Sequence, residues 1–179
     1  GVTLPDTWEE YLMGLRKKDR HELRRKLRRL ESAEQGFRWY ARSGLTEVEE
    51  SFDDFLTLMR KSKEEKSAFL TGPKEKFFRA IVLKLASVGI LKLFFMELGD
   101  ERVAAALCFD YGSGRLLYNS GFNPDYGYYS VGLLLHALCL RDAIEEGKSY
   151  FDFLRGSEPY KYDLGGKNRT IYHMVVTRP

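Results

Sequence analysis

The feature that most constrains the fold is a change in the spacing of apolar residues, from about four to two, at residue 91. Three segments with the two-residue period of strands follow it: residues 91–98, 102–111 and 115–122. Gly99-Asp100 and Gly112-Ser113-Gly114 separate these segments, and links this short join antiparallel neighbours. The sequence therefore predicts a three-stranded antiparallel meander.

The residues after the meander predict one parallel strand pair. Residues 131–146 form a strongly apolar helical segment that ends at Gly147, and residues 150–154 have the composition of a buried strand. A right-handed crossover through this helix makes the strands at 115–122 and 150–154 parallel. Residues 155–168 are irregular and polar, and residues 170–177 are predicted as a final strand.

The first half of the chain adds helices to this sheet. Helical spacing is found in residues 46–61, where Thr46 and Glu49 have the form of a capping box, and in residues 75–88. A short aromatic strand is expected at 36–41 and a polar loop at 61–73. The order of elements predicts an α/β or α+β domain with a mixed, mostly antiparallel sheet and helices on both faces.

The charge is concentrated near the start of the chain. The whole chain has a net charge of +3, whereas residues 16–29 hold nine Lys or Arg and only two Asp or Glu. Leucines at helical spacing make residues 1–35 a basic amphipathic helix, capped by Asp6 or Thr7 and packed on a domain of residues 36–179. The basic face is interpreted either as a solvated surface or as a surface that binds the phosphates of a nucleic acid or nucleotide cofactor.

Composition excludes several classes of protein. Apolar residues make up 44% and charged residues 31%, which is typical of a globular chain. We find neither an 18-residue apolar run nor a secretory leader, and Cys108 and Cys139 lie in apolar contexts typical of buried thiols in a reducing compartment. A cytoplasmic location is therefore expected, although the sequence alone leaves a disulfide between the two cysteines open. The three histidines are scattered, so no metal site is expected. The chain begins with Gly1, and we expect it to be the C-terminal part of a longer protein.

Four stretches of sequence resemble a known family. The strand order is similar to that of the GNAT acyltransferase superfamily, and local motifs resemble the GNAT-like domain of CelD-type proteins, which are related to Fem-type aminoacyl transferases. The first stretch is Trp-Glu-Glu-Tyr-Leu (8–12) with His-Glu-Leu-Arg-Arg-Lys (21–26). The others are Gly-Asp-Glu-Arg-Val-Ala-Ala (99–105), Tyr-Asn-Ser-Gly-Phe-Asn-Pro (118–124), and Phe-Asp-Phe-Leu-Arg-Gly (151–156) with Glu-Pro-Tyr-Lys-Tyr (158–162).

The resemblance implies acyl transfer from acyl-CoA to an amine. In GNAT-like folds the strands matching 115–122 and 150–154 splay apart, and the pantetheine arm of the donor pairs with the first of them. The resemblance implies donor contacts at Asn119, Ser120 and Gly121, and pyrophosphate contacts at Ser130 and Gly132, where a helix begins. The loop at 126–132 departs from the family pattern, because no Arg, Lys or Gln lies among its glycines.

Acyl transfer to an amine needs a base, stabilisation of an oxyanion and an acid for the leaving group. We predict Tyr160 or Tyr162 as the acid and Lys161 as the residue that stabilises negative charge or holds a phosphate, with a plain solvated loop as the alternative. Asp152 is predicted either as an ion-pair partner of Arg155 or as the general base.

Further residues are assigned to the acceptor or to the core. Arg155 and Glu158 are expected near the acceptor, and Tyr128 and Tyr129 either line the mouth of its site or cap the edge of the sheet. His136 lies on the apolar crossover helix, so we expect a hydrogen-bonded imidazole in the core.

Three functions are consistent with these residues. The first is a GNAT N-acyltransferase that uses acyl-CoA and an amine on a small molecule, sugar or cell-envelope precursor. The second is a Fem-type transfer from aminoacyl-tRNA, to which the basic helix would contribute. The third is a catalytically degenerate GNAT-like module that binds a ligand.

Overall fold

The computed structural model describes residues 1–177 and is built on one six-stranded sheet. The strands lie in the order β1-β6-β5-β4-β3-β2, and every neighbouring pair is antiparallel except β5 and β6. Their bounds are β1 Val2–Thr3, β2 Phe37–Arg42, β3 Leu91–Leu98, β4 Glu101–Tyr111, β5 Gly114–Phe122 and β6 Tyr150–Asp152. The predicted meander, the parallel pair and the mixed α/β class are confirmed.

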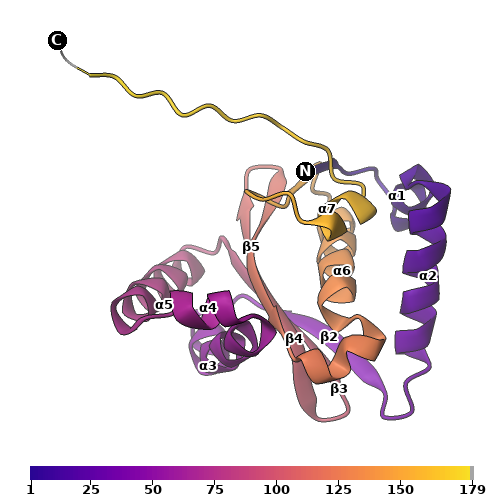
Figure 1. Cartoon of the computed structure of the whole chain (residues 1–179), viewed down its shortest axis with the longest axis horizontal. Helices are drawn as coiled ribbons and strands as arrows, with labels where there is room; N and C mark the ends of the chain where they lie inside the picture. Colours follow the sequence, from indigo (N-terminus) through magenta and orange to yellow (C-terminus); the bar gives the residue numbers. More distant parts are fainter. Residues whose placement is uncertain (178–179) are drawn as a thin grey trace.

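Helices cover both faces of the sheet (Figure 1). Helices α3, α4 and α5 lie on one face, and α1, α2, α6 and α7 lie on the other. Their bounds are α1 Trp8–Gly14, α2 Lys17–Glu31, α3 Leu45–Ser62, α4 Glu64–Phe69, α5 Gly72–Ser87, α6 Val131–Glu145 and α7 Pro159–Asp163, with a 3₁₀ helix, η1, at Pro124–Tyr129. The loop between β5 and α6 is therefore helical in part.

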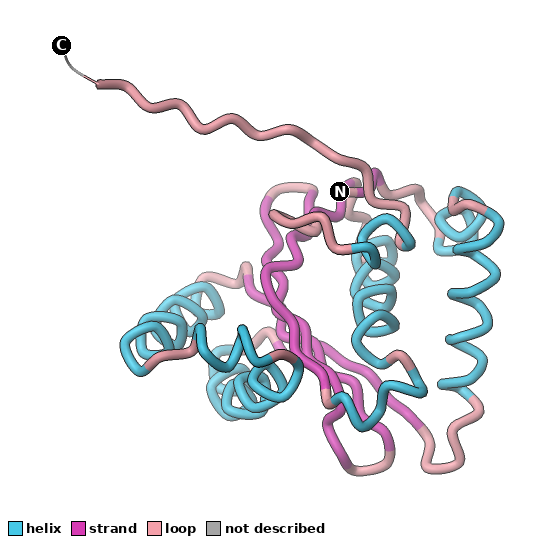
Figure 2. The backbone as a smooth tube through the Cα atoms, viewed as in Figure 1, coloured by secondary structure: helices cyan, strands magenta, loops and turns pink. Residues whose placement is uncertain are grey.

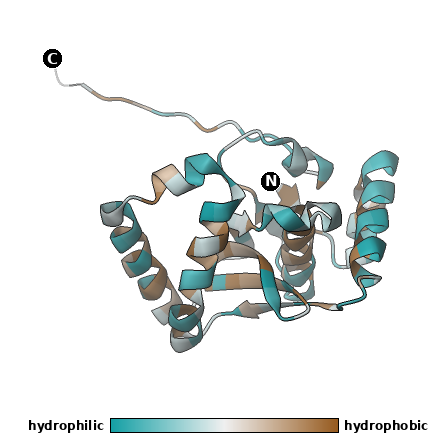
Figure 3. Ribbon diagram, turned by 60° about the horizontal axis from the view of Figure 1, so that its bottom comes forward, coloured by the Kyte–Doolittle hydropathy of each residue, from teal (hydrophilic) through white to brown (hydrophobic). Residues whose placement is uncertain are grey.

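The central strands are apolar on both sides because each side faces a layer of helices. In β3, Phe94 and Met96 pack in the cluster that includes α6, while Leu93 and Phe95 pack in the cluster that includes α3 and α5. All four side chains are fully buried. Figure 3 shows the same pattern, with apolar colour on the inner strands and on α6 and polar colour over much of α2.

The basic segment folds as two helices rather than one. Thr7 caps α1 and forms a capping box with Glu10, as the sequence predicts for one of its two candidate caps. Extended backbone at Leu15 and Arg16 then separates α1 from α2, which corrects the single helix expected there. Leu23 and Leu30 of α2 are buried in the core beside α6.

Two segments predicted to be irregular contain short helices. Helix α4 lies within the loop expected at 61–73. Helix α7 lies within residues 155–168, because Pro159 fixes the φ angle of its first residue.

Helix α3 begins slightly earlier than expected. The side chain of Glu47 accepts a hydrogen bond from the backbone of Gly44, so the predicted pairing of Thr46 with Glu49 is wrong.

The predicted final strand is absent. Residues 170–177 have no strand or helix, and their side chains are exposed, Ile171 to 74% and Tyr172 to 91%. Figure 2 shows this segment as an extended chain that leaves the body of the domain. The outer edge of β6 is instead paired with β1, antiparallel, so the position beside β6 is already filled.

Candidate functional site

The strands β5 and β6 part after three residues. Gly114–Leu116 pairs with Tyr150–Asp152, β6 then ends, and β5 continues to Phe122 without a strand partner on that edge. Leu154 has a φ of 55°, a left-handed conformation that turns the chain away from β5. The Leu154 N–H is held in this turn by the Asp152 carboxylate, at 2.8 Å.

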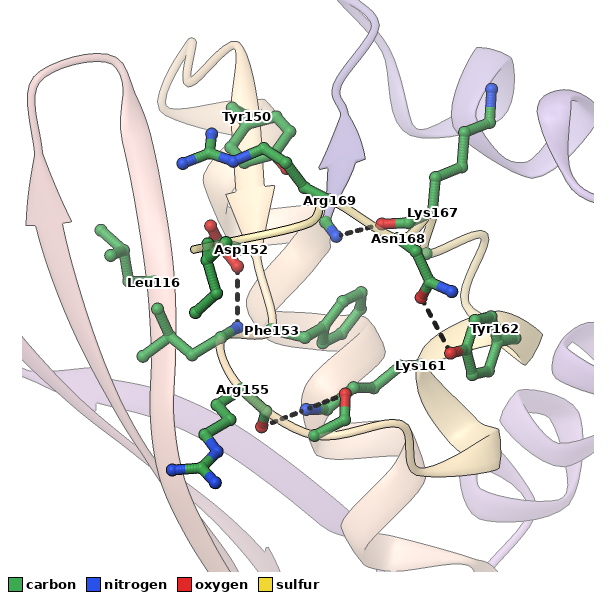
Figure 4. Close-up of a pocket in the computed structure, with 15 residues that line it drawn as sticks. Leu116, Tyr150, Asp152, Phe153, Arg155, Lys161, Tyr162, Lys167, Asn168 and Arg169 are labelled. Carbon is green, nitrogen blue, oxygen red and sulfur yellow. Dashed lines mark hydrogen bonds between the residues drawn. The ribbon is translucent and has the colours of Figure 1, made fainter. Parts of the chain in front are cut away.

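A cavity of about 410 Å³ opens where the two strands part (Figure 4). It brings together Asp152, Arg155, Lys161 and the candidate acid Tyr162 of the predicted site. It adds Asn168, whose side chain accepts a hydrogen bond from the Tyr162 hydroxyl at 2.8 Å. The remaining lining comes from Gly1, from both strands, from the loop after β6 and from the segment after α7. Glu158 and Tyr160 do not line this cavity, although they flank Lys161 in sequence.

Lys161 is buried, and its ammonium is held by several groups of the preceding loop. The Nζ atom donates to the carbonyl oxygens of Arg155, at 2.9 Å, and Gly156, at 3.3 Å, and pairs with the Glu158 carboxylate at 2.9 Å. The hydrogen bond from Lys161 lowers the pKa of Glu158. Lys161 thus fixes the loop 155–158 at the cavity, and its positive charge lies at the place where the sequence predicts it.

The expected ion pair between Asp152 and Arg155 is wrong. No salt bridge joins Asp152 to any residue that the structure describes, and the carboxylate caps the backbone turn at Leu154 instead. Arg155 is exposed at the edge of the cavity. The reason is local: the turn at Leu154 offers the carboxylate an N–H two residues away, a common way to satisfy Asp.

Tyr160 lies one layer deeper, against His136 of α6. Their ring centroids are 4.8 Å apart, and the Tyr160 ring also contacts Phe153. Burial raises the pKa of Tyr160 to about 12, so the phenol is protonated at neutral pH. Both ring nitrogens of His136 are buried and have no hydrogen-bond partner within residues 1–177, which corrects the hydrogen-bonded imidazole expected there.

The free edge of β5 is covered by side chains. The backbone N–H of Asn123 donates to the Val103 carbonyl of β4. Backbone groups of successive strand residues point to opposite edges, so those of Ser120, three residues earlier, point to the outer edge. The Ser120 N–H is bound by the side chain of Asn119, at 2.8 Å, and the Ser120 carbonyl accepts from the ammonium of Lys66 in α4. Leu107 of β4 pairs with Asn119, and the next residue, Cys108, pairs with Leu117. Tyr118 is therefore an extra, unpaired residue in β5, a β-bulge directly before Asn119.

Gly121 is placed against α3 rather than toward a ligand. A Cβ atom at this position would lie 2.2 Å from the backbone nitrogen of Met59. Glycine here permits β5 and α3 to approach closely, which explains the residue without a donor contact. Of the three donor-binding residues predicted on β5, Asn119 and Ser120 reach the outer edge and Gly121 does not.

The start of α6 lies beside the basic helix α2. Ser130 precedes α6 with a φ of 55°, and Gly132 contacts the ring of Phe122. Arg29 of α2 donates to the Tyr128 carbonyl at 2.6 Å, and its guanidinium lies 4.7 Å from the centre of the Tyr128 ring. Tyr129 packs on the core with its ring edge-on to Tyr128.

Sequence reasoning did not identify Lys66 or Arg29 as site residues. The polar stretch around Lys66 gives no indication of a helix whose side chains reach β5. Arg29 is one of nine basic residues in its segment, and nothing in the local sequence distinguishes it from the others. One feature of the sequence could have indicated Arg29. The loop before α6 has no Arg or Lys, so a phosphate site there would need a cation from another element.

No group of metal-binding side chains and no helix fit to cross a membrane occurs in the described part of the chain. Cys108 and Cys139 are both free and buried.

Comparisons with known proteins place this geometry in a family. The family model for the acetyltransferase (GNAT) domain matches residues 17–162. No curated protein matches the sequence. Among solved structures, FemX aligns with a TM-score of 0.64 and 14% identity, over 84% of this chain and 50% of its own length. The chain thus spans about half the length of FemX.

Two acetyltransferases also share the fold. An aminoglycoside acetyltransferase from an uncultured soil metagenomic sample, in complex with sisomicin, has a TM-score of 0.52 and 13% identity, over 79% of this chain and 97% of its own. AAC(6')-Iy, in complex with a CoA-containing bisubstrate analogue, has a TM-score of 0.52 and 14% identity, over 78% and 99%. The family match over most of the residues, on a sheet with one splayed parallel pair, shows that the chain belongs to the GNAT acetyltransferase family.

Proposed function

We propose that this chain transfers an acyl group from acyl-CoA to an amine at the point where β5 and β6 part. The observation that carries the proposal is the early end of the β5–β6 pairing, which leaves the outer edge of β5 without a strand partner and opens a cavity beside it. An unpaired strand edge can bind an extended chain that carries amide groups, as the pantetheine arm of CoA does.

The donor's phosphates would lie at the start of α6. The backbone N–H groups of a helix N-terminus favour an anion, and the guanidinium of Arg29 lies beside them through its contact with Tyr128. Arg29 would thereby supply the cation that the loop itself lacks. We accordingly assign Ser130, Gly132 and Arg29 to the phosphate end of the donor, and Asn119 and Ser120 to its pantetheine arm.

The chemistry would follow an addition–elimination course. The amine nitrogen forms a bond to the thioester carbonyl carbon, the C–S bond breaks, and the amine loses one proton while the thiolate gains one. Asp152 is the carboxylate at the cavity that can accept the amine's proton. We assign the acid for the thiolate to the half-buried phenol of Tyr160, which lies one layer behind the cavity. Lys161 holds the loop that ends at Glu158 and leads into α7, the helix that carries Tyr160. Arg155, Tyr128 and Tyr129 are assigned to the rim that meets the acceptor.

A second candidate is transfer from aminoacyl-tRNA in the manner of Fem-type enzymes. It is favoured by the fold likeness to FemX and by α2, whose exposed side carries many basic residues. Several of these cations are already paired, among them Arg24 with Glu9 and Arg25 with Glu22. We therefore rank acyl-CoA first. Since acyl-CoA is an intracellular metabolite, we propose a cytoplasmic location, in which two free thiols are stable.

Calorimetric titration of the protein with acetyl-CoA and with CoA tests the proposal. We expect binding of both, weakened about tenfold by Arg29→Ala, since a charge-assisted contact to phosphate contributes about 1.4 kcal/mol or more. Arg28→Ala is the matched control, because Arg28 is the exposed neighbour on the same helix. Absence of binding at millimolar ligand would overturn the assignment to acyl-CoA, and salt-sensitive binding of aminoacyl-tRNA would then support the second candidate.

A further inference from the structure

Helix α5 is apolar on two opposite sides, although only one of them packs on the domain. Phe78, Val82 and Ala86 recur every four residues and are buried in the cluster that includes α3 and β3. Phe77 and Ile81 lie on the opposite side of the helix and are exposed to 69% and 38%. A surface helix of a globular domain ordinarily places polar residues on its outer side. The outer side of α5 therefore differs from that of an ordinary surface helix.

The exposed apolar surface continues past Phe77 and Ile81 at both ends. Val88 directly follows α5 on the same side and is exposed to 55%. Phe69, the last residue of α4, is exposed to 46%, and the ammonium of Lys74 lies 4.6 Å from the centre of its ring. We call this surface the α5 outer face. Several large apolar side chains exposed on one face of a protein mark a surface that meets another molecule.

The charges on the α5 outer face are all positive. Its cations are three exposed lysines, none of which has a carboxylate partner within residues 1–177: Lys74, Lys76 and Lys84. Glu75 is the one acidic residue of α5, and it pairs with Arg79, at 2.7 Å, and with Arg60 of α3. The carboxylate is therefore neutralised on the side that faces the domain. A partner of the outer face has to offer both an apolar layer and negative charge.

An anionic lipid bilayer offers both in one surface. Aromatic and aliphatic side chains enter the boundary between headgroups and acyl chains, while the long stems of lysines let their ammonium groups reach the lipid phosphates. A second copy of this chain fits less well, because a two-fold contact through this face sets lysines against lysines. Figure 1 shows α5 at the outside of its layer, on the opposite side of the molecule from α1 and α2, where a flat surface can reach it.

We propose that the α5 outer face binds this chain to the surface of an anionic bilayer. The helix lies in the plane of the headgroups, Phe77 and Ile81 enter the apolar boundary, and the lysines bind lipid phosphates. This contact does not depend on the proposed acyl transfer. It leaves the cavity between β5 and β6 open, because the residues that line that cavity come from neither α4 nor α5.

Sedimentation of the protein with lipid vesicles tests the proposal. We expect binding to vesicles of phosphatidylcholine and phosphatidylglycerol in equal parts, and little binding to phosphatidylcholine alone. Phe77→Ser with Ile81→Ser is expected to lower the partition coefficient at least about tenfold, since two apolar side chains no longer leave water. Lys74→Gln with Lys84→Gln is expected to lower it about tenfold at low salt. All four side chains are exposed, so the melting temperature of both variants should match that of the unaltered protein.

Two matched controls carry the same kinds of substitution at other exposed positions. Ile171→Ser with Val175→Ser removes apolar side chains from the segment after α7, and Lys17→Gln with Lys18→Gln removes two charges from the start of α2. Both are expected to bind the mixed vesicles within about twofold of the unaltered protein, because a surface substitution acts locally.

Several results would overturn the proposal. Absence of binding to the mixed vesicles is one, and an unchanged partition coefficient in the variant of Phe77 and Ile81 is another. An equal loss in the α2 control would show attraction by net charge alone, and an equal loss in the control of Ile171 and Val175 would assign the contact to the segment after α7. Light scattering without lipid addresses a protein partner: a dimer that dissociates in the variant of Phe77 and Ile81 would make the outer face an interface between two copies of the chain.

Discussion

The phenol of Tyr160 is the proton donor that the proposed reaction places beside the leaving thiolate. Because burial raises its pKa to about 12, the proton is present throughout the neutral range and on to about pH 9. We expect Tyr160→Phe to lower kcat by about 10²-fold, the range typical of general acids, and we expect the rate of the unaltered enzyme to show no loss through ionisation of this group below pH 9. Steady-state kinetics with a thiol reagent for released CoA measures both.

Tyr162→Phe tests the other phenol that the sequence offers as the acid. The Tyr162 hydroxyl donates to Asn168 at the cavity, so we expect this variant to keep a kcat close to that of the unaltered enzyme. In Tyr160→Phe the contacts of the ring with His136 and Phe153 remain, so the melting temperature should stay close to that of the parent. An unchanged kcat in Tyr160→Phe would show that another group, or water, protonates the thiolate.

Individual site residues differed in how far the sequence could locate them. Asp152 ends the strand whose position a crossover helix dictates, and Tyr160 and Lys161 follow that strand, so their place near its end was predictable. The partners of Asp152 and His136 were not, because these depend on backbone angles and packing at one turn and one helix face. Lys66 and Ser120 are hydrogen-bonded although they lie 54 residues apart in the sequence. The sequence pattern around either residue gives no information about such a contact.

At the scale of elements, the contact between β5 and α3 depends on the absence of a side chain at Gly121. A Cβ there would lie 2.2 Å from the Met59 nitrogen and 2.4 Å from the Leu58 carbonyl carbon, both backbone atoms that cannot rotate away. We expect Gly121→Ala to lower the free energy of unfolding by about 3 kcal/mol or more, at or above the usual cost of overpacking. Urea denaturation followed by circular dichroism measures the change.

Gly127→Ala provides the comparison, because nothing lies within 4 Å of a Cβ built there and its φ is not positive. Its unfolding free energy is expected to change by less than about 0.5 kcal/mol. If Gly121→Ala were equally neutral, α3 would not approach β5 as closely as described.

A buried ion network fastens the start of β5 to α6. The Arg115 side chain is fully buried and pairs with Asp110 at 2.7 Å, with Glu146 at 2.5 Å and with Asp142. Desolvation raises the pKa of Asp110, but hydrogen bonds from Arg115 outweigh it, and the net pKa is lowered; the pKa of Glu146 is likewise lowered. We expect Arg115→Ala to cost about 3 kcal/mol, because it empties a fully buried site and removes the cation that three carboxylates share. The cost stays at the lower end of the range for broken buried pairs, because Lys92 and Lys148 still pair with these carboxylates.

The sign of the pH dependence follows from these lowered values. A carboxylate with a lowered folded pKa stabilises the protein above its ordinary pKa of about 4, and this contribution is lost as pH falls through the folded value. Stability should therefore fall between about pH 5 and pH 2, and the fall should be smaller in Arg115→Ala. Arg141→Ala, which removes an exposed pair with Glu145, should change stability by less than about 1 kcal/mol and keep the full pH dependence.

The elements of the meander were predictable because their pattern and their turns agree, and the crossover rule fixed the parallel pair. The break between α1 and α2 was missed because leucine spacing continues across it. The strand expected at 170–177 has strong β propensity and no partner, which shows that propensity alone does not form a strand. The outer edge of β6 is filled by β1, and no local signal indicates this pairing between segments about 150 residues apart.

At the scale of the whole molecule, the large apolar side chains within residues 170–177 are exposed. Ile171 and Val175 are exposed to 74% and 72%, so burial of these residues contributes nothing to the stability of the domain. We expect Ile171→Ser with Val175→Ser to leave the free energy of unfolding unchanged within about 0.5 kcal/mol. Urea denaturation at two protein concentrations is the measurement, with light scattering to report the oligomeric state.

A different result would show that this segment pairs with a second copy of the chain in solution. The free energy of unfolding would then fall in the double variant and would rise with protein concentration in the unaltered protein. In that case residues 170–177 would form an interface between two copies of the chain, and they would be exposed only in a single copy.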